Sequence, residues 1–98
     1  MLEKDIERKV CEYAKSKGCL AYKFTSPARA AVPDRLFVAP SGRMWFCEFK
    51  RQGQKPTDAQ AREHQRLRGH KVNVFVIDNV DEGRTMVDIM TLDCARLG

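Results

Sequence analysis

The sequence has no apolar run long enough to cross a bilayer. A membrane-spanning helix needs about 20 apolar residues in a row, and no stretch of this chain approaches that length. The opening segment MLEKDIERKV carries charges where an export signal would place its apolar region. The sequence therefore predicts a protein that is neither exported nor embedded in a membrane, and we expect it in the cytoplasm.

The sequence also lacks the cysteine and histidine spacings of metal sites. No two cysteines form a Cys-x-x-Cys pair, and His64 and His70 lie six residues apart with no cysteine near them. Three of the four cysteines sit within apolar segments. This pattern favours reduced, mostly buried thiols over a disulfide pair or a zinc site; the cysteines are Cys11, Cys19, Cys47 and Cys94.

Internal repeats, low-complexity tracts and long linkers are absent as well, so we expect one domain that spans residues 1–98. The 98 residues include 18 Lys and Arg against 13 Asp and Glu, which gives a formal net charge of +5. An excess of positive charge favours a polyanionic partner such as nucleic acid over an acidic substrate. Many basic domains bind no DNA, so the charge alone does not identify the partner.

Apolar periodicity predicts an α/β sandwich around a mixed sheet. Apolar residues recur at spacings of three and four over residues 2–14, which is typical of an amphipathic helix, and Gly18 would stop it. Thr57 would cap a second helix that Gly69 stops. The almost continuous apolar run in the last strand indicates burial on both of its faces. Between and after these helices we expect strands over 19–24, 34–39, 43–50 and 71–78, and a last helix over 81–92.

The hairpin formed by residues 34–50 is the most specific local feature. If Pro40, Ser41 and Gly42 make a three-residue loop, paired residues have numbers that sum to 82, and Asp34 lies opposite Glu48. Opposed residues share a face of the sheet with Cβ atoms about 5 Å apart, and Lys50, two residues on, points the same way. A loop one residue shorter would turn Asp34 to the other face.

Two carboxylates this close repel one another unless a cation lies between them, so a divalent metal ion is the natural occupant. Mg²⁺ takes oxygen ligands, here Asp34, Glu48 and the backbone carbonyl of Phe49, and Lys50 beside it would orient an attacking water. The alternative is that these residues form a solvated polar strand end, although exposed ion pairs contribute only about 0 to 1 kcal/mol to stability.

These residues resemble the PD-(D/E)XK nuclease motif, with Pro33-Asp34 followed by Glu48-Phe49-Lys50. More narrowly, the segments VPDRLFVAPSGRMWFCEFKRQGQKPTDAQ and LRGHKVNVFVI resemble the VRR-NUC family of virus-type replication and repair nucleases, and the match runs over residues 31–77. The resemblance implies a restriction-endonuclease-like fold and cleavage of DNA with Mg²⁺ or Mn²⁺. It is closest to the stand-alone phage or bacterial form, which places the protein in a bacterial or phage-infected cytoplasm.

The same resemblance implies roles for individual residues. Asp34 and Glu48 would bind the metal ion, and Lys50 would be the catalytic lysine. Gln60 matches the family's helical glutamine that assists the site, and Glu7 matches the acidic residue of the first helix, which reaches the metal directly or through water. The alternative for Glu7 is a solvated position on an exposed helix.

Basic residues flank the predicted site in the sequence. They are candidates for contacts with DNA phosphates, or a solvated basic rim; the residues are Lys23, Arg29, Arg35, Arg51 and Lys55. The family's stand-alone members imply a homodimer that resolves four-way (Holliday) junctions, since two symmetric cuts need two sites. Apolar residues that would cover such an interface, or simply form the core, include Trp45, Phe46, Met86 and Met90.

Two further readings compete with the nuclease. A non-catalytic DNA-binding module would keep the fold and the charge without turnover, although the intact Asp34, Glu48 and Lys50 set argues against it. A small structural or adaptor protein with a chance match would bind neither metal nor DNA.

Overall fold

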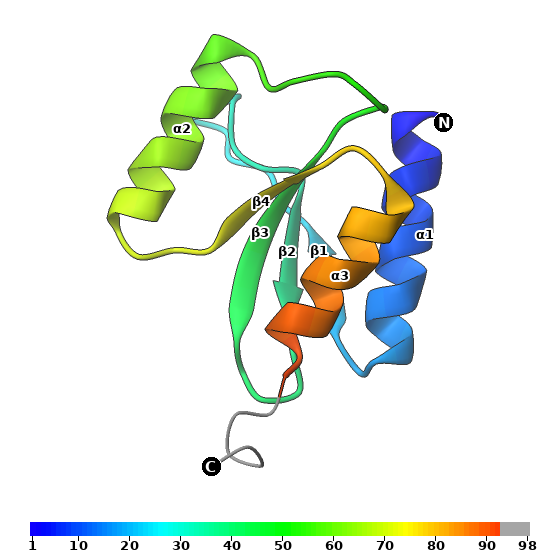
Figure 1. The fold of residues 1–98 in the computed structure, drawn as a ribbon. Coiled ribbons are helices and arrows are strands. Elements are labelled where there is room, and N and C mark those ends of the chain that lie inside the picture. The colour runs from blue at the N-terminus through cyan, green and yellow to red at the C-terminus, as the bar shows by residue number, and fades with distance from the viewer. Residues whose placement is uncertain (93–98) are drawn as a thin grey trace.

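A computed structural model describes residues 1–92 of the chain as a four-stranded sheet with three helices (Figure 1). The element order is the predicted one: helix, three strands, helix, strand, helix. The elements are α1 (Glu3–Ser16), β1 (Leu20–Lys23), β2 (Arg35–Val38), β3 (Met44–Phe49), α2 (Asp58–Gly69), β4 (Val74–Ile77) and α3 (Val80–Met90). No helix within the described part is long and apolar enough to cross a membrane.

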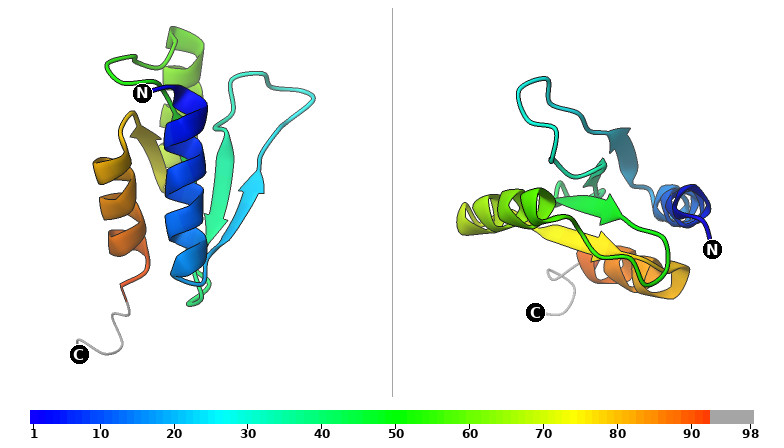
Figure 2. Two further views of the ribbon diagram at one scale, coloured as in Figure 1. Left: turned by 90° about the vertical axis from the view of Figure 1, so that its right-hand side faces the viewer. Right: turned by 90° about the horizontal axis from the view of Figure 1, so that it is seen from above.

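The sheet is mixed, as the sequence predicts. Its strand order is β1-β2-β3-β4, with antiparallel pairing from β1 to β3 and parallel pairing between β3 and β4. Parallel neighbours need a crossover connection, and α2 supplies it. Helices α1 and α3 pack side by side on one face, whereas α2 lies toward the other face beside β4 (Figure 2).

The hairpin between β2 and β3 has the predicted register. Arg35 pairs with Cys47 and Val38 pairs with Met44, so each pair of numbers sums to 82. The loop closes through a hydrogen bond of 2.8 Å from the Gly42 N–H to the carbonyl oxygen of Ala39, and Gly42 has a φ of +90°. Because glycine adopts a positive φ without steric cost, the three-residue loop forms and its register carries through the whole hairpin.

The main core lies between the sheet and the α1–α3 layer. Phe37 and Trp45 stack with ring centroids 5.2 Å apart, and both are fully buried. Trp45, Met86 and Met90, considered above as interface residues, belong to this core. A Cβ atom on Gly83 would come within 2.3 Å of a Val10 methyl group, so the absence of a side chain there lets α3 approach α1 closely.

Most element ends lie one to three residues from the predicted ones, and three differences stand out. Gly69 is the last residue of α2, and Lys71, with a φ of +66°, takes the left-handed position instead, because the N–H groups after Gly69 still bond back to Leu67 and Arg68. Strand β4 covers only residues 74–77 of the predicted 71–78, with Val74 and Ile77 buried on opposite faces. Helix α3 starts at Val80 because the side chain of Asn79 caps it.

The described cysteines are reduced and buried, as predicted. Cys11, Cys19 and Cys47 are free thiols, and burial raises the pKa of each. A raised pKa keeps a thiol protonated and unreactive. Cys94 lies outside the described residues.

Candidate active site

The two predicted metal ligands meet at one end of the hairpin. Asp34 directly precedes β2, and the register places it opposite Glu48 of β3 on the same face of the sheet. The Asp34 side chain is anchored there, since its Oδ2 accepts a hydrogen bond of 2.8 Å from the backbone N–H of Phe49. The sheet therefore brings the two carboxyl groups together, as the loop length predicts.

Glu48 is a buried acid with an altered affinity for its proton. Its side chain is 2% exposed, and its pKa is raised to about 8, first because of burial and second because the Asp34 carboxylate lies beside it. The Lys50 ammonium acts in the opposite direction, with Nζ 3.9 Å from Glu48 Oε2. The raised pKa favours the protonated form of Glu48 in the absence of a cation, and a bound cation would favour the ionised form.

Gln60 contacts Glu48 from α2, as the prediction of an assisting glutamine requires. Its Nε2 donates a hydrogen bond of 3.2 Å to Glu48 Oε2. Its Oε1 accepts the N–H of Thr57, and the Thr57 hydroxyl accepts the N–H of Gln60, which forms a capping box at the start of α2. The cap holds Gln60 in the rotamer that reaches the site.

His64 is a site residue that the sequence did not predict, because its spacing from the other histidine does not match a metal site. It lies one helical turn after Gln60 and is 1% exposed on its side chain, with Nε2 3.6 Å from Glu48 Oε1. Burial lowers its pKa and the nearby Arg68 lowers it further, which favours the neutral imidazole. The spacing of four residues from Gln60 is the signal that places both side chains on one helix face.

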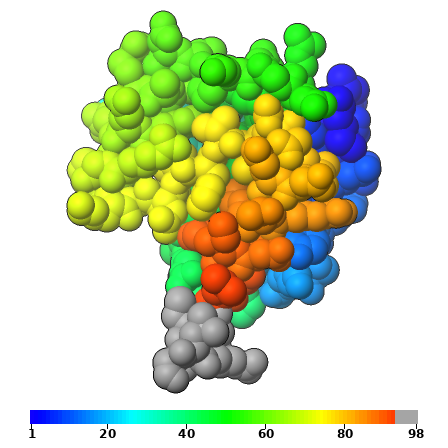
Figure 3. Space-filling view, viewed as in Figure 1, coloured from blue at the N-terminus to red at the C-terminus, as the bar shows by residue number. Residues whose placement is uncertain are grey.

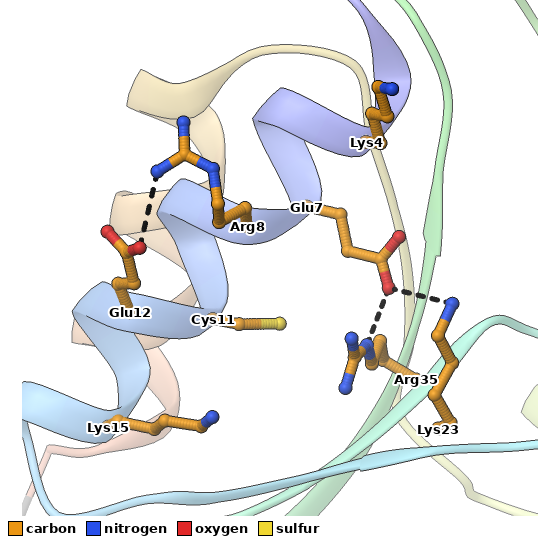
Figure 4. A pocket seen from close by; sticks show the side chains of 8 residues that line it. All are labelled: Lys4, Glu7, Arg8, Cys11, Glu12, Lys15, Lys23 and Arg35. Carbon is orange, nitrogen blue, oxygen red and sulfur yellow. Dashed lines mark hydrogen bonds and ion pairs between the residues drawn. The ribbon is translucent and has the colours of Figure 1, made fainter.

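Glu7 lies in a different cluster. Its carboxylate accepts a hydrogen bond of 2.6 Å from Arg35 Nε and lies 3.5 Å from Lys23 Nζ (Figure 4). Arg35 follows Asp34 in the strand, so its side chain points to the opposite face of the sheet. The structure therefore does not bring Glu7 to Asp34 and Glu48. Of the acids on α1, Glu3 is the one whose charge contributes, weakly, to the raised pKa of Glu48.

The Glu7 cluster forms a basic pocket of about 370 Å³ on the α1 side. Two of the predicted DNA contacts, Lys23 and Arg35, lie here and are ion-paired with Glu7. The cations that line this pocket are Lys4, Arg8, Lys15, Lys23 and Arg35.

The other predicted DNA contacts lie elsewhere. Arg29 pairs with Glu63 of α2 at 3.2 Å and lines a second cavity, of about 470 Å³, together with Arg62 and Arg66. Segment 51–57 runs across the top of the molecule from α2 toward the start of α1 (Figures 1 and 3). Arg51 and Lys55 are exposed on it.

The donor set fits a hard divalent cation. Within residues 1–92, no three His, Cys, Asp or Glu side chains cluster as a metal site. Mg²⁺ and Mn²⁺ do not need three such side chains, because Mg²⁺ commonly binds one or two carboxylates and keeps several waters. Glu48 Oε1 is buried without a hydrogen-bond partner in the described structure, so this carboxyl group has acceptor capacity to spare for a cation.

No family model matches the chain, but a related protein and a solved structure indicate the same family. "Putative nuclease p44" of Acyrthosiphon pisum secondary endosymbiont phage 1 is 44% identical over 79 residues, which cover 81% of this chain and 85% of that protein. A solved structure described as a VRR_NUC domain matches with a TM-score of 0.82 and 31% identity, over 88% of this chain and 94% of that one. The chain shares this restriction-endonuclease-like α/β fold and belongs to the VRR-NUC family of nucleases.

Proposed function

We propose that the protein is a metal-dependent endonuclease that hydrolyses phosphodiester bonds of DNA in the cytoplasm of a bacterial or phage-infected cell. The observation that carries the proposal is the convergence of Asp34, Glu48 and Lys50 at one end of the hairpin, with Glu48 buried and its pKa raised. Stability alone does not account for this arrangement, because a buried acid that must ionise destabilises the fold.

Each residue has a role in this proposal. Asp34, Glu48 and the Phe49 carbonyl would hold Mg²⁺ or Mn²⁺, which when bound polarises the phosphate and lowers the pKa of a coordinated water. The Lys50 ammonium would orient the attacking water and offset negative charge that develops on the phosphate. Gln60 holds Glu48 in place. Glu7 lies on the far face of the sheet, where it holds Arg35 and Lys23.

The second cavity offers a path for the DNA backbone. Arg62 and Arg66 are exposed on the helix that contacts Glu48, and Arg29 faces them across the cavity. Glu63, which neighbours His64, holds Arg29 and Arg66 at 3.2 and 3.5 Å. Guanidinium groups suit phosphate oxygens, so these arginines, with Arg51 and Lys55 on the adjacent segment, would position the strand at the site.

We further propose a homodimer that cuts four-way junctions, because two symmetric cuts need two sites related by a twofold axis. The support is the open sheet face, the part of the sheet on the Glu48 side that α2 leaves uncovered. Three of its six side chains, on β1 and β3, are at least 50% exposed, and none is charged. The open sheet face consists of Leu20, Tyr22, Leu36, Val38, Met44 and Phe46.

A second copy is the occupant that this face fits. The pairing register places its side chains in two rows across the three strands, all apolar, in a protein with 32% charged residues. In a twofold contact each patch meets its own copy, and a charge-free patch avoids opposing like charges from two chains that each carry +5. Phe46 is two residues from Glu48, so the contact would hold both sites near the axis.

Cleavage of a labelled synthetic four-way junction tests the activity, with linear duplex and single strands alongside, in Mg²⁺, Mn²⁺ or EDTA. We expect paired symmetric cuts with either metal, none in EDTA and none with Glu48→Ala. Glu12→Ala, the same change at an exposed helix position, is the matched control and should cut normally. Junction binding without any cleavage by the wild type would instead support a non-catalytic DNA-binding module.

Sedimentation of the wild type and Tyr22→Lys tests the assembly. We expect a dimeric wild type and a monomeric Tyr22→Lys, whose paired cuts become single nicks. Ile89→Lys places the same charge at an exposed apolar residue of α3 and should stay dimeric. A monomeric wild type, or a dimeric Tyr22→Lys, would contradict an interface on the open sheet face.

A further inference from the structure

Two buried polar atoms face each other at the proposed metal site. Glu48 Oε1 and His64 Nε2 lie 3.6 Å apart, and neither has a hydrogen-bond partner among the described residues. The two side chains are 2% and 1% exposed, so water does not reach them freely. Buried polar groups in folded proteins are almost always paired, and the simplest pairing joins these two atoms to each other.

The other contacts of Glu48 indicate which of the two atoms donates the hydrogen bond and which accepts it. Glu48 Oε2 already accepts from Gln60 Nε2 at 3.2 Å and faces the Lys50 ammonium at 3.9 Å, which leaves Oε1 for His64. A carboxylate that binds a metal ion is ionised, and an ionised carboxylate can only accept hydrogen bonds. In the metal-bound site the hydrogen between the two atoms must therefore sit on His64 Nε2. A closure of about 0.6 Å would bring the atoms to the usual N–H···O distance.

We propose that His64 is a positioning residue for the metal site: its Nε2–H donates to Glu48 Oε1 and, together with Gln60, orients the carboxylate that binds the metal. The inference rests on the proposed nuclease function. Gln60 and His64 are one turn apart on α2, so one rigid element holds both oxygens of Glu48. Each oxygen keeps a second lone pair for the metal. Removal of a residue that hydrogen-bonds to a metal ligand usually lowers the metal affinity or the activity 10- to 100-fold.

The location of the imidazole hydrogen separates this role from direct ligation. A metal-ligating Nε2 would present a lone pair and carry no hydrogen, whereas a positioning Nε2 carries one. Nitrogen-15 correlation spectra of the wild type with Mg²⁺, a diamagnetic ion, distinguish the two forms without any mutation. We expect a protonated Nε2 for His64. An unprotonated Nε2 in the Mg²⁺-bound protein would overturn the proposal.

Substitutions supply a second readout, the affinity for Mn²⁺ measured by electron paramagnetic resonance on the protein without DNA. His64→Leu keeps an apolar side chain of similar size and removes the donor, and we expect a loss of at least 10-fold. His64→Gln places an amide N–H near the Nε2 position and should stay within about 3-fold of the wild type. His70→Gln, at an exposed position just after the same helix, is the matched control and should not change the affinity.

The outcomes separate the two proposals. Equal Mn²⁺ affinity of the wild type and a folded His64→Leu would overturn the role of His64 and leave the nuclease intact. Absence of metal binding by the wild type would overturn the nuclease proposal, and the role of His64 with it. If His64→Leu fails to fold, His64→Gln and the spectra of the wild type still decide: a folded His64→Gln that loses about 10-fold or more in Mn²⁺ affinity would count against positioning.

Discussion

Gln60 joins the start of α2 to the carboxylate of Glu48. Its side-chain oxygen accepts the N–H of Thr57 at 2.9 Å, while its side-chain nitrogen donates to Glu48 Oε2 at 3.2 Å. One amide therefore completes a helix cap and contacts the proposed metal ligand. The position of α2 along the sheet is coupled to the site through this residue.

The helix cap and the contact with Glu48 are separable by mutation. Thr57→Ala removes the hydroxyl that accepts the Gln60 N–H and leaves the Glu48 contact in place. We expect a loss of about 1 kcal/mol in the free energy of unfolding, with little change in cleavage rate. Gln60→Ala removes both side-chain contacts of Gln60, the one with the Thr57 N–H and the one with Glu48, so cleavage should also fall about 10-fold or more. Urea unfolding and junction cleavage measure the two effects, and equal loss of cleavage in both variants would contradict the separation.

Glu48 makes the metal-free protein less stable as pH rises. Its pKa is about 8 in the folded state against 4.5 for the unfolded chain, so the folded state binds more protons between these values. The free energy of unfolding therefore falls as pH rises through this window, at up to about 1.4 kcal/mol per pH unit. Between pH 5.5 and 8.5 in EDTA, we expect the free energy of unfolding of the wild type to fall on the order of a few kcal/mol more than that of Glu48→Gln.

Urea unfolding at the two pH values, with and without metal, makes this comparison. Mg²⁺ at high pH should restore the free energy of unfolding of the wild type and leave that of Glu48→Gln almost unchanged, because only an ionised Glu48 binds the cation. A wild type and a Glu48→Gln variant with parallel pH profiles would show that Glu48 ionises normally.

Lys50 is expected to affect turnover more than metal binding. Its side chain is 10% exposed and its ammonium lies 3.9 Å from Glu48 Oε2, so it is held at the site. Lys50→Gln should lower the cleavage rate about 100-fold or more, since it removes the charge that orients water and offsets the developing negative charge. Mn²⁺ affinity should stay equal or increase, because a nearby positive charge is lost. Lys17→Gln, at an exposed position just after α1, is the control, and a parallel loss of Mn²⁺ affinity in Lys50→Gln would point to a structural role.

The two basic regions should differ in their contribution to DNA binding. Arg62 is exposed beside the second cavity, on the helix that contacts Glu48, whereas Arg8 is exposed on α1 and pairs with Glu12. Arg62→Ala should weaken binding of all duplex sequences and reduce the slope of log affinity against log salt by about 1. Arg8→Ala should leave the slope unchanged. Fluorescence anisotropy in EDTA, which prevents cleavage, measures both, and the opposite pattern would place DNA on the α1 side.

The local features of the hairpin and of the α2 cap are predictable from the sequence. A three-residue loop with glycine at its last position determines the register, and the period of two then places Asp34, Glu48 and Lys50 on one face. Thr57 and Gln60 have the spacing of a capping box. These relationships depend on neighbours in the chain or on one turn, so no knowledge of distant packing is needed.

Other features depend on contacts between distant segments. The face to which Glu7 points follows from the packing of α1 on the sheet, which the close approach of Gly83 to Val10 helps to set. The same holds for His64, which becomes buried only because α2 lies against the face that carries Glu48. A helical periodicity shows which side chains share a face, but not which surface covers that face.

The sequence by itself therefore determined the order of elements, the opposed carboxylates and the family, because period, turn length and motif spacing are local properties of the chain. The tertiary structure alone decided that Glu7 holds cations on the far face, that His64 reaches Glu48, and that one half of a sheet face stays uncovered. Each of these depends on how helices pack across the sheet, where the free energy comes from side chains far apart in the sequence.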